Sequence, residues 1–154
     1  TPSLQPTLNT LPDLGEPVAF KAIEFSEREM DHGNHEPMTM SMLQSMFMVD
    51  GKVFEMDRID LRSHVGDVEE WRVFNNSHMD HPFHLHGTQF QVTQREQNGV
   101  ATPEPFKAWR DTVNLRPYET VVFHVKQLTP VIRMFHCHIL EHEDLGMMAN
   151  LEVI

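Results

Sequence analysis

The sequence predicts an all-β fold, a Greek-key sandwich of two packed sheets. Short runs rich in β-branched and aromatic residues recur along the chain, and several alternate apolar with polar residues. Turn-forming pairs such as Gly66-Asp67 and Asn98-Gly99 separate these runs. No long stretch repeats apolar residues at helical spacing. Roughly seven or eight short strands with such punctuation are typical of an antiparallel sandwich.

The strands are expected in the following order. VAFKAIEF (18–25) alternates well enough to form the first strand. Asp50-Gly51 then predicts a tight hairpin within 48–54. Further strands are expected at 58–62, 68–75, 84–93, 111–115, 119–125, 131–137 and 149–154. Any helix is expected only in the methionine-rich segment or in the turn after Cys137.

At 154 residues the chain is most simply one domain with a single hydrophobic core. Residues 1–17 contain four prolines and are interpreted as an extended lead-in or linker. The domain itself is expected over 18–154. A methionine- and histidine-rich insertion near 29–48 holds six of the eleven methionines.

The formal charge of −11 argues against nucleic acid or an anionic membrane as a partner. Every apolar run is far shorter than the roughly 18–20 residues that span a bilayer. The start of the chain has neither a basic nor an apolar region of signal-peptide type, so no signal peptide is expected there. These observations leave the compartment open.

Most of the candidate metal-binding residues lie in two histidine-rich segments. The only cysteine, Cys137, lies between two histidines, and His142 and Met147 follow within ten residues. An isolated cysteine is usually a small buried hydrophobe. A thiolate with imidazoles and a weak thioether, however, is the ligand set of a blue-copper electron-transfer centre. The segment HPFHLH (81–86) adds three further histidines.

Strand parity divides these ligands between two sites. Residues two apart in a strand share a face, so the histidines flanking Cys137 point away from it. The first predicted site comprises His81, Cys137, His142 and Met147. The second comprises His84, His86, His136 and His138. Zinc could occupy the first set, but a thioether is a poor ligand for structural zinc. The alternative is that these are surface or core histidines that bind no metal.

The two segments resemble copper motifs of the multicopper oxidases. HPFHLHGTQF (81–90) is similar to the third motif of that family, and HCHILEHEDLGMM (136–148) to the fourth. Weaker similarity extends over most of 46–154. The nearest likeness is to bacterial copper-efflux (cuprous) oxidases, because of HGTQF, HEDLGMM and the methionine-rich insertion. The resemblance implies a cupredoxin-like fold and the C-terminal domain of a three-domain, laccase-like enzyme.

The resemblance also implies a role for each ligand. The type 1 copper would take His81, Cys137, His142 and Met147, the type 2 copper His84, and the type 3 pair His86, His136 and His138. Electrons would pass from a small donor through Cys137 and its flanking histidines to a trinuclear cluster, which reduces dioxygen to water. Glu143 matches an acidic position thought to help deliver protons, and the alternative is a solvated loop carboxylate. The family implies copper homeostasis in the periplasm or outside the cell.

One departure from the family is decisive. The trinuclear cluster of these enzymes takes eight histidines, half of them from two His-x-His motifs in the first domain. This chain has no further His-x-His beyond 84–86 and 136–138. It is therefore expected to supply half a cluster, to need N-terminal cupredoxin domains of the same enzyme as partners, and to be inactive in isolation.

The methionine-rich insertion suggests a donor. Thioethers favour Cu(I), and Met38, Met42 and Met46 would share one helical face. Met79 resembles a substrate-copper position of the cuprous oxidases. The alternative is that methionines fill an irregular apolar gap. Cu(I), other metals and phenols all remain possible donors.

The family pattern has an aspartate four residues before the type 1 histidine, where this chain has Ser77. Asp80 is a candidate to compensate for it. Two other functions are compatible with parts of the pattern. A stand-alone cupredoxin electron carrier explains only the first site, and a copper-binding or storage module explains the richness in Met and His but not the order of the ligands.

Overall fold

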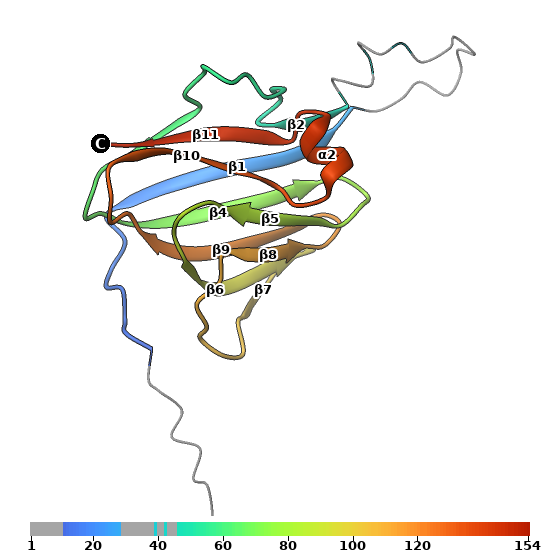
Figure 1. Cartoon of the computed structure of the whole chain (residues 1–154). Coiled ribbons are helices and arrows are strands. Elements are labelled where there is room, and N and C mark those ends of the chain that lie inside the picture. The colour runs from blue at the N-terminus through green and yellow to red at the C-terminus, as the bar shows by residue number, and fades with distance from the viewer. Residues whose placement is uncertain (1–10, 29–38, 40–41, 43–45) are drawn as a thin grey trace, which may run out of the picture.

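The computed structural model describes residues 11–28, 39, 42 and 46–154. Two β-sheets pack face to face (Figure 1). The strands are β1 (Ala19–Glu27), β2 (Phe47–Val49), β3 (Leu61–Ser63), β4 (Val68–Asn76), β5 (His81–Leu85), β6 (Phe90–Gln97), β7 (Val100–Pro103), β8 (Thr112–Leu115), β9 (Glu119–Lys126), β10 (Val131–Cys137) and β11 (Met148–Val153), and the helix is α2 (Leu140–Asp144).

One sheet has the order β2-β1-β4-β9-β6-β7 and the other β3-β11-β10-β5-β8. The predicted all-β sandwich is confirmed. Most neighbouring strands run antiparallel, but β1 pairs with β4, and β3 with β11, in parallel. The prediction of an antiparallel sandwich was wrong at these two pairs, because the direction of each depends on the long connection between its strands, which the spacing of strands along the sequence does not show.

The core lies between the inner faces of the two sheets. Strand β4 alternates buried and less buried residues, as a strand with one face on the core must. Trp71, Phe83, Phe123 and Phe135 are fully buried. The Trp71 ring lies 5.7 Å from Phe123 in its own sheet and 5.6 Å from Phe135 in the other. This aromatic cluster holds the sheets at a fixed spacing.

The strand expected at 84–93 is two strands instead. Strand β5 ends at Leu85 in one sheet, and β6 begins at Phe90 in the other. Between them Gly87 has a φ of 63°, a conformation that glycine adopts without steric cost. The chain therefore leaves one sheet directly after Leu85 and crosses to the second, which a continuous alternation of residues does not reveal.

The predicted Asp50-Gly51 hairpin is present. Val49 and Lys52 exchange both backbone hydrogen bonds, each of 2.9 Å. Asp50 and Gly51 have φ values of 51° and 68°, as a primed two-residue turn requires. The Asp50 carboxylate also accepts a hydrogen bond of 2.8 Å from the Glu24 amide, which fastens the turn to β1.

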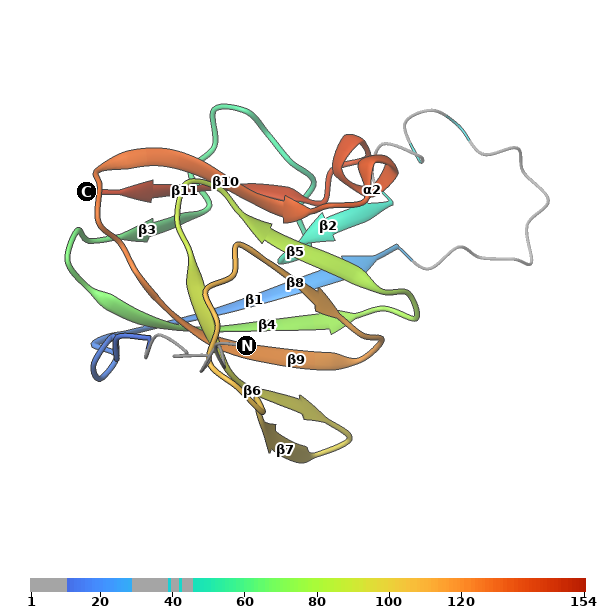
Figure 2. The ribbon, with the colours of Figure 1, turned by 60° about the horizontal axis from the view of Figure 1, so that its bottom comes forward.

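One end of the sandwich gathers the elements that matter below. Helix α2 lies beside the start of β2 and the end of β1 (Figures 1 and 2). The Phe47 ring at the start of β2 stacks on His142 of α2 at 4.0 Å. A helical turn after Cys137, as predicted, thus closes over that end. Among the described residues, no helix is long and apolar enough to cross a membrane.

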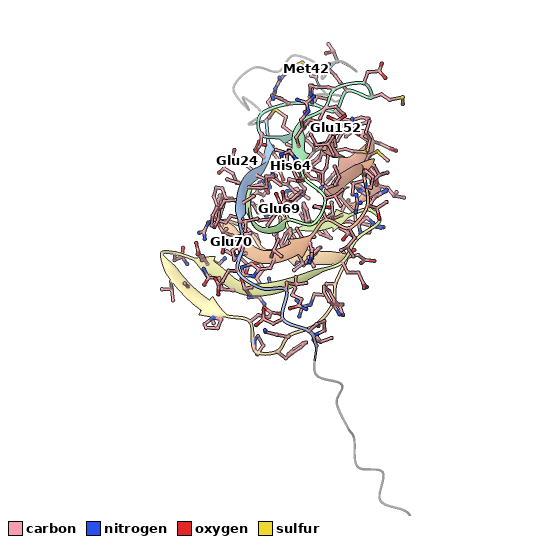
Figure 3. The ribbon with its side chains drawn as sticks, turned by 90° about the vertical axis from the view of Figure 1, so that its left-hand side faces the viewer. Glu24, Met42, His64, Glu69, Glu70 and Glu152 are labelled. Atoms are coloured by element: carbon pink, nitrogen blue, oxygen red, sulfur yellow. The ribbon has the colours of Figure 1, made fainter. Side chains whose placement is uncertain are left out.

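Most of the methionine-rich insertion, including Met38, lies outside the described residues, so the shared helical face stays a prediction. Met46 is partly buried against the core, and Met42 is exposed. Figure 3 shows Met42 at the edge of the molecule and Glu69 among its packed side chains. The buried Glu69 carboxylate accepts hydrogen bonds from the Trp71 indole (2.9 Å) and from the Gln127 amide (3.2 Å).

Candidate metal centres

Three buried side chains meet under α2. His81 begins β5, Cys137 ends β10 and His142 lies within α2. The two imidazole Nδ1 atoms lie 3.1 Å apart. The Cys137 Sγ atom lies 3.5 Å from Nδ1 of His81 and 3.6 Å from Nδ1 of His142. Three donor atoms from three different elements, β5, β10 and α2, therefore converge on one small space.

The dimensions of this triangle fit a metal ion. A point about 2 Å from all three donor atoms lies within it, which is the length of a metal–imidazole bond and slightly shorter than a metal–thiolate bond. Two imidazoles and one thiolate in a plane are the equatorial ligands of a blue-copper site. Because all three side chains are buried, water does not compete for the ion.

Met147 lies where the loop after α2 returns to the site. It is fully buried. Its carbonyl accepts a hydrogen bond of 3.1 Å from the Cys137 amide, and its own amide donates one of 2.9 Å to the His142 carbonyl. Backbone contacts to two members of the triangle thus fix the residue that the sequence predicts as the axial ligand.

Two residues contact the outer nitrogen of the His81 ring, and the sequence analysis named only one of them, Ser77. With Nδ1 turned into the triangle, Nε2 carries the proton and donates it to Ser77 Oγ at 2.7 Å. Glu27 Oε1, at the end of β1, lies 3.2 Å from the same nitrogen. The Asp80 carboxylate accepts a hydrogen bond from Asn114 instead, so it does not take the place of the family aspartate.

Glu27 is the site residue that the sequence analysis missed. Its second carboxylate oxygen lies 3.3 Å from Nδ1 of His78, whose side chain is three-quarters exposed. The Glu27 carboxylate thus links the exposed imidazole of His78 to the buried imidazole of His81. Nearby Met79 is 39 % exposed. No local pattern marks Glu27, because it is far from the copper motifs in sequence and adjacent only in the fold.

Burial sets the protonation of the metal-free triangle. It lowers the pKa of His81 to about 4, with a smaller contribution from the neighbouring His142 and an opposing one from Glu27. Burial also lowers the pKa of His142 and raises the pKa of the Cys137 thiol to about 11. Two neutral imidazoles and a protonated thiol result, so metal binding at neutral pH must displace the thiol proton.

These pKa values predict a stability plateau for the metal-free chain. Between pH 6.5 and about 4 the unfolded chain binds more protons at His81 than the folded one, so the free energy of unfolding falls as the pH is lowered, by about 3 kcal/mol in all. Between pH 9 and about 11 the unfolded chain has already lost the Cys137 proton, so stability falls again. Urea unfolding from pH 4 to 11 measures both limbs.

The control for this prediction is Cys137→Ser, which should remove the alkaline limb and leave the acid limb. The His124→Gln variant, which changes a histidine outside the triangle, should keep both. A flat profile below pH 6.5 in the unaltered chain would contradict the buried, neutral state of His81.

A second group of histidines lies on the other side of the same strands. Donor nitrogens of His84, His86 and His136 all lie within 4.8 Å of one another. The closest pair, Nε2 of His86 and Nε2 of His136, is 2.8 Å apart. His138 is exposed and lies at the margin, with its ring 5.3 Å from that of His84. Three of the four predicted imidazoles therefore converge closely, and the fourth is adjacent.

Other contacts fix the second nitrogen of these rings. His84 Nδ1 lies 3.0 Å from the Asp111 carbonyl and 2.9 Å from Thr112 Oγ1, so its Nε2 is left for a metal. His136 Nδ1 lies 2.9 Å from the Cys137 carbonyl. Fixing one nitrogen determines the tautomer and the orientation of a ligand ring.

Strand register explains the two groups. In the β5–β10 ladder His136 lies opposite His84, and Cys137 lies opposite the buried Phe83. Side chains alternate faces along each strand, so Cys137 turns into the sandwich while its two neighbours turn out of it. Side-chain parity, read from the sequence, therefore predicted which residues gather on which side.

Glu143 reaches the second group. Its Oε2 atom lies 3.2 Å from Nδ1 of His136, and its side chain is about a quarter exposed. Because α2 turns back over the end of β10, this carboxylate contacts both solvent and a cluster histidine. This contact separates Glu143 from the exposed Glu141 of the same helix.

Gly146 holds the loop between the helix and Met147. Its φ is 113°, and an added Cβ would lie 2.5 Å from Val53 Cγ1 and 3.1 Å from the Phe47 carbonyl oxygen. We expect Gly146→Ala to cost about 2 kcal/mol or more, because backbone strain and the clash add. Gly99→Ala is the matched control, since Gly99 also has positive φ but no atom within 4 Å. Equal unfolding free energies for the two variants would contradict this packing.

Comparison with known proteins identifies the family. The profile of the multicopper oxidases matches residues 25–154. The chain belongs to the multicopper oxidase family. It is 39% identical over 109 residues to a multicopper oxidase of Staphylococcus aureus, which covers 68% of this chain and 24% of that protein.

Solved structures support the same assignment. A multicopper oxidase from Campylobacter jejuni, described as a metallo-oxidase, has 47% identity and a TM-score of 0.88 over 95% of this chain and 32% of its own. A laccase from Pediococcus acidilactici has 37% identity and a TM-score of 0.77 over 100% of this chain and 31% of its own. The chain is a cupredoxin domain of C-terminal type and spans about a quarter to a third of these relatives. Copper is the metal of the family, and the triangle fits it.

Proposed function

We propose that this chain is the C-terminal domain of a copper-dependent oxidase and carries one complete copper site and half of another. The domain would comprise residues 18–154, after a lead-in of 1–17 and with the Met/His-rich insertion near 29–48. The type 1 copper would be held by His81, Cys137, His142 and Met147, the type 2 copper by His84, and the type 3 pair by His86, His136 and His138. The observation that carries the proposal is that the two ligand groups lie on opposite sides of β10, one residue apart.

The covalent connection explains the order of the ligands. Cys137 belongs to the buried group, and its two neighbours belong to the other. A path of a few bonds therefore joins the sites, through Cys137 and the adjacent peptide units. The hydrogen bond between His136 Nδ1 and the Cys137 carbonyl shortens that path further. Copper at the two sites would supply one-electron oxidation of a donor and reduction of dioxygen to water.

The chain's own histidines supply only half of the second site. The opposite half would come from N-terminal cupredoxin domains of the same enzyme, because this chain has no other His-x-His. The small share of each relative that the chain covers supports this interpretation. The isolated chain would accept electrons but would not reduce dioxygen.

Donor electrons would arrive at the edge of His81. The surface His78, the half-exposed Met79 and the Glu27 carboxylate lie there and offer N, S and O ligands to a small metal donor. We propose Cu(I) as the donor, with phenol-like compounds as the alternative, since relatives include both a metallo-oxidase and laccases. A periplasmic or extracellular location follows from the same family.

Copper loading tests the proposed function. The chain should take up one copper in a site with intense blue absorption and the narrow hyperfine splitting of a type 1 signal in electron paramagnetic resonance. Tight Cu(I) binding without a blue oxidised form would contradict it and favour a storage module. A blue chain that shows no change when N-terminal domains of the enzyme are added would instead favour a stand-alone electron carrier.

A further inference from the structure

A cavity of about 650 Å³ opens beside the second histidine group. The turn at Gly87 and the corner at Leu128-Thr129 form its sides, and His84 forms part of its wall. Two cations, Lys126 and Arg133, line it. Neither forms an ion pair with any described residue of a chain whose formal charge is −11. The local charge is thus opposite to that of the whole chain.

Arg133 is held without a counter-charge. It is only 7% exposed and donates to the carbonyls of His86 (3.4 Å) and Thr129 (3.3 Å). Its Nε has no acceptor. Buried arginines without a carboxylate are uncommon, because a desolvated charge is costly unless it is paired. Two long carbonyl contacts satisfy only part of a group with five N–H donors.

The one carboxylate among the residues that line the cavity, Asp111, does not provide a counter-charge for Arg133. Asp111 accepts a hydrogen bond of 3.0 Å from the Thr112 hydroxyl, and its Oδ1 lies 4.0 Å from His84 Nδ1. It forms no ion pair with Arg133 or Lys126. The cavity therefore presents two cations, apolar walls at Leu14 and Trp109, and no anion in contact with either cation.

We propose that this cavity binds a carboxylate, and that its occupant is an acidic side chain of the adjoining cupredoxin domain. The proposal rests on the proposed function, in which another domain covers His84 and completes the cluster. Since His84 belongs to the cavity wall, a surface that covers it also reaches the cavity. Removing water from Lys126 and Arg133 is unfavourable unless that surface brings a negative charge. Arginine offers a carboxylate two parallel hydrogen bonds, which fix orientation as well as contact.

A tethered carboxylate suits the cavity better than a free one. The cavity is open on one side, so a small anion there keeps much of its water and binds weakly. A side chain on a domain that already docks nearby has a high effective concentration. Its ion pair would also hold the Gly87 turn, whose neighbour His86 is a cluster ligand bonded through its carbonyl to Arg133.

The first test uses the 154-residue chain in its copper-loaded, reduced form. Sodium acetate is titrated at constant ionic strength, with acetamide as the neutral probe, while NMR follows the Arg133 Nε–H and the Gly87 amide. We expect a saturable shift with acetate and none with acetamide. Lys126→Met should weaken acetate binding about fivefold and Arg133→Met should abolish it. Lys52→Met, which removes an exposed lysine outside the cavity, should have no effect.

The second test uses the complete enzyme. Acetate should no longer shift the Arg133 signal, because the adjoining domain occupies the site. Lys126→Glu should reduce the type 2 copper signal in electron paramagnetic resonance about tenfold and leave the type 1 signal intact. Lys52→Glu should leave both unchanged. Lys126 contacts no cluster ligand among the described residues, so this loss would not arise from a displaced histidine.

Two results would overturn the proposal. One is the absence of saturable acetate binding to the chain. The other is unchanged acetate binding in the complete enzyme, which would make the cavity a small-molecule site. Failure of the proposed function looks different. The complete enzyme would then lack a type 2 signal in every form, while acetate titration of the chain would still show the carboxylate site.

Discussion

Cys137→Ser is expected to abolish the blue absorption of the copper-loaded chain completely. That colour arises from a thiolate bound to copper, and this chain has no second cysteine to replace it. Serine keeps the size of the side chain in a fully buried position, so the fold should persist. Visible absorption and electron paramagnetic resonance of the two proteins, loaded under the same conditions, measure the effect.

His124→Ala provides the control for that experiment. His124 lies outside both ligand groups and contacts Glu70, so its removal should leave the colour unchanged. Retention of the blue band in the serine variant would rule out Cys137 as the type 1 thiolate. Loss of the band in the His124 variant would show that colour reports the general state of the fold and not the ligand triangle.

Glu143→Gln is expected to slow dioxygen reduction by the complete enzyme about 100-fold, the usual scale for removal of a proton donor. The carboxylate lies 3.2 Å from His136 Nδ1, and the amide of glutamine keeps the shape but cannot deliver a proton. Reduction of the type 1 copper by a donor should keep its rate. Stopped-flow measurement of type 1 reduction and of its reoxidation by dioxygen separates the two steps.

Glu141→Gln is the matched control, because Glu141 is an exposed glutamate on the same helix and contacts no histidine of the second group in the described part of the chain. It should leave both rates unchanged. If both variants slow reoxidation equally, the effect follows the charge of α2 and not a proton path. If neither does, Glu143 is a solvated loop carboxylate, the alternative that the sequence left open.

The sequence predicted which histidines lie on the same side of β10 as Cys137, and which on the other, better than it predicted the bounds of the strands that carry them. Alternation of side chains along a strand is a local rule, so the separation of Cys137 from His136 followed from spacing alone. The break at Gly87 did not, because a crossing between sheets depends on where β5 finds its partners. The parallel pairing of β1 with β4 depends in the same way on the whole topology.

The residues around the ligands were the least predictable. Ser77 marked a departure from the family, but its hydrogen bond to His81 required the turn at 77–80 to be in place. Glu27 reaches the same ring from β1, and nothing in its local sequence sets it apart. The charge of Arg133 likewise becomes informative only when its burial is known. The roles of these residues depend on contacts between segments that are distant in the chain, and a single sequence does not show which distant segments meet.

Oxygen consumption by the purified, copper-loaded chain tests the central claim most directly. The claim is that one complete site and half of a second share β10 in this chain. With the blue site filled and a donor in excess, the chain should become reduced once per type 1 copper and then consume no dioxygen above the rate of free copper. Addition of the N-terminal domains of the same enzyme should start turnover. Sustained reduction of dioxygen to water by the chain alone would contradict the account.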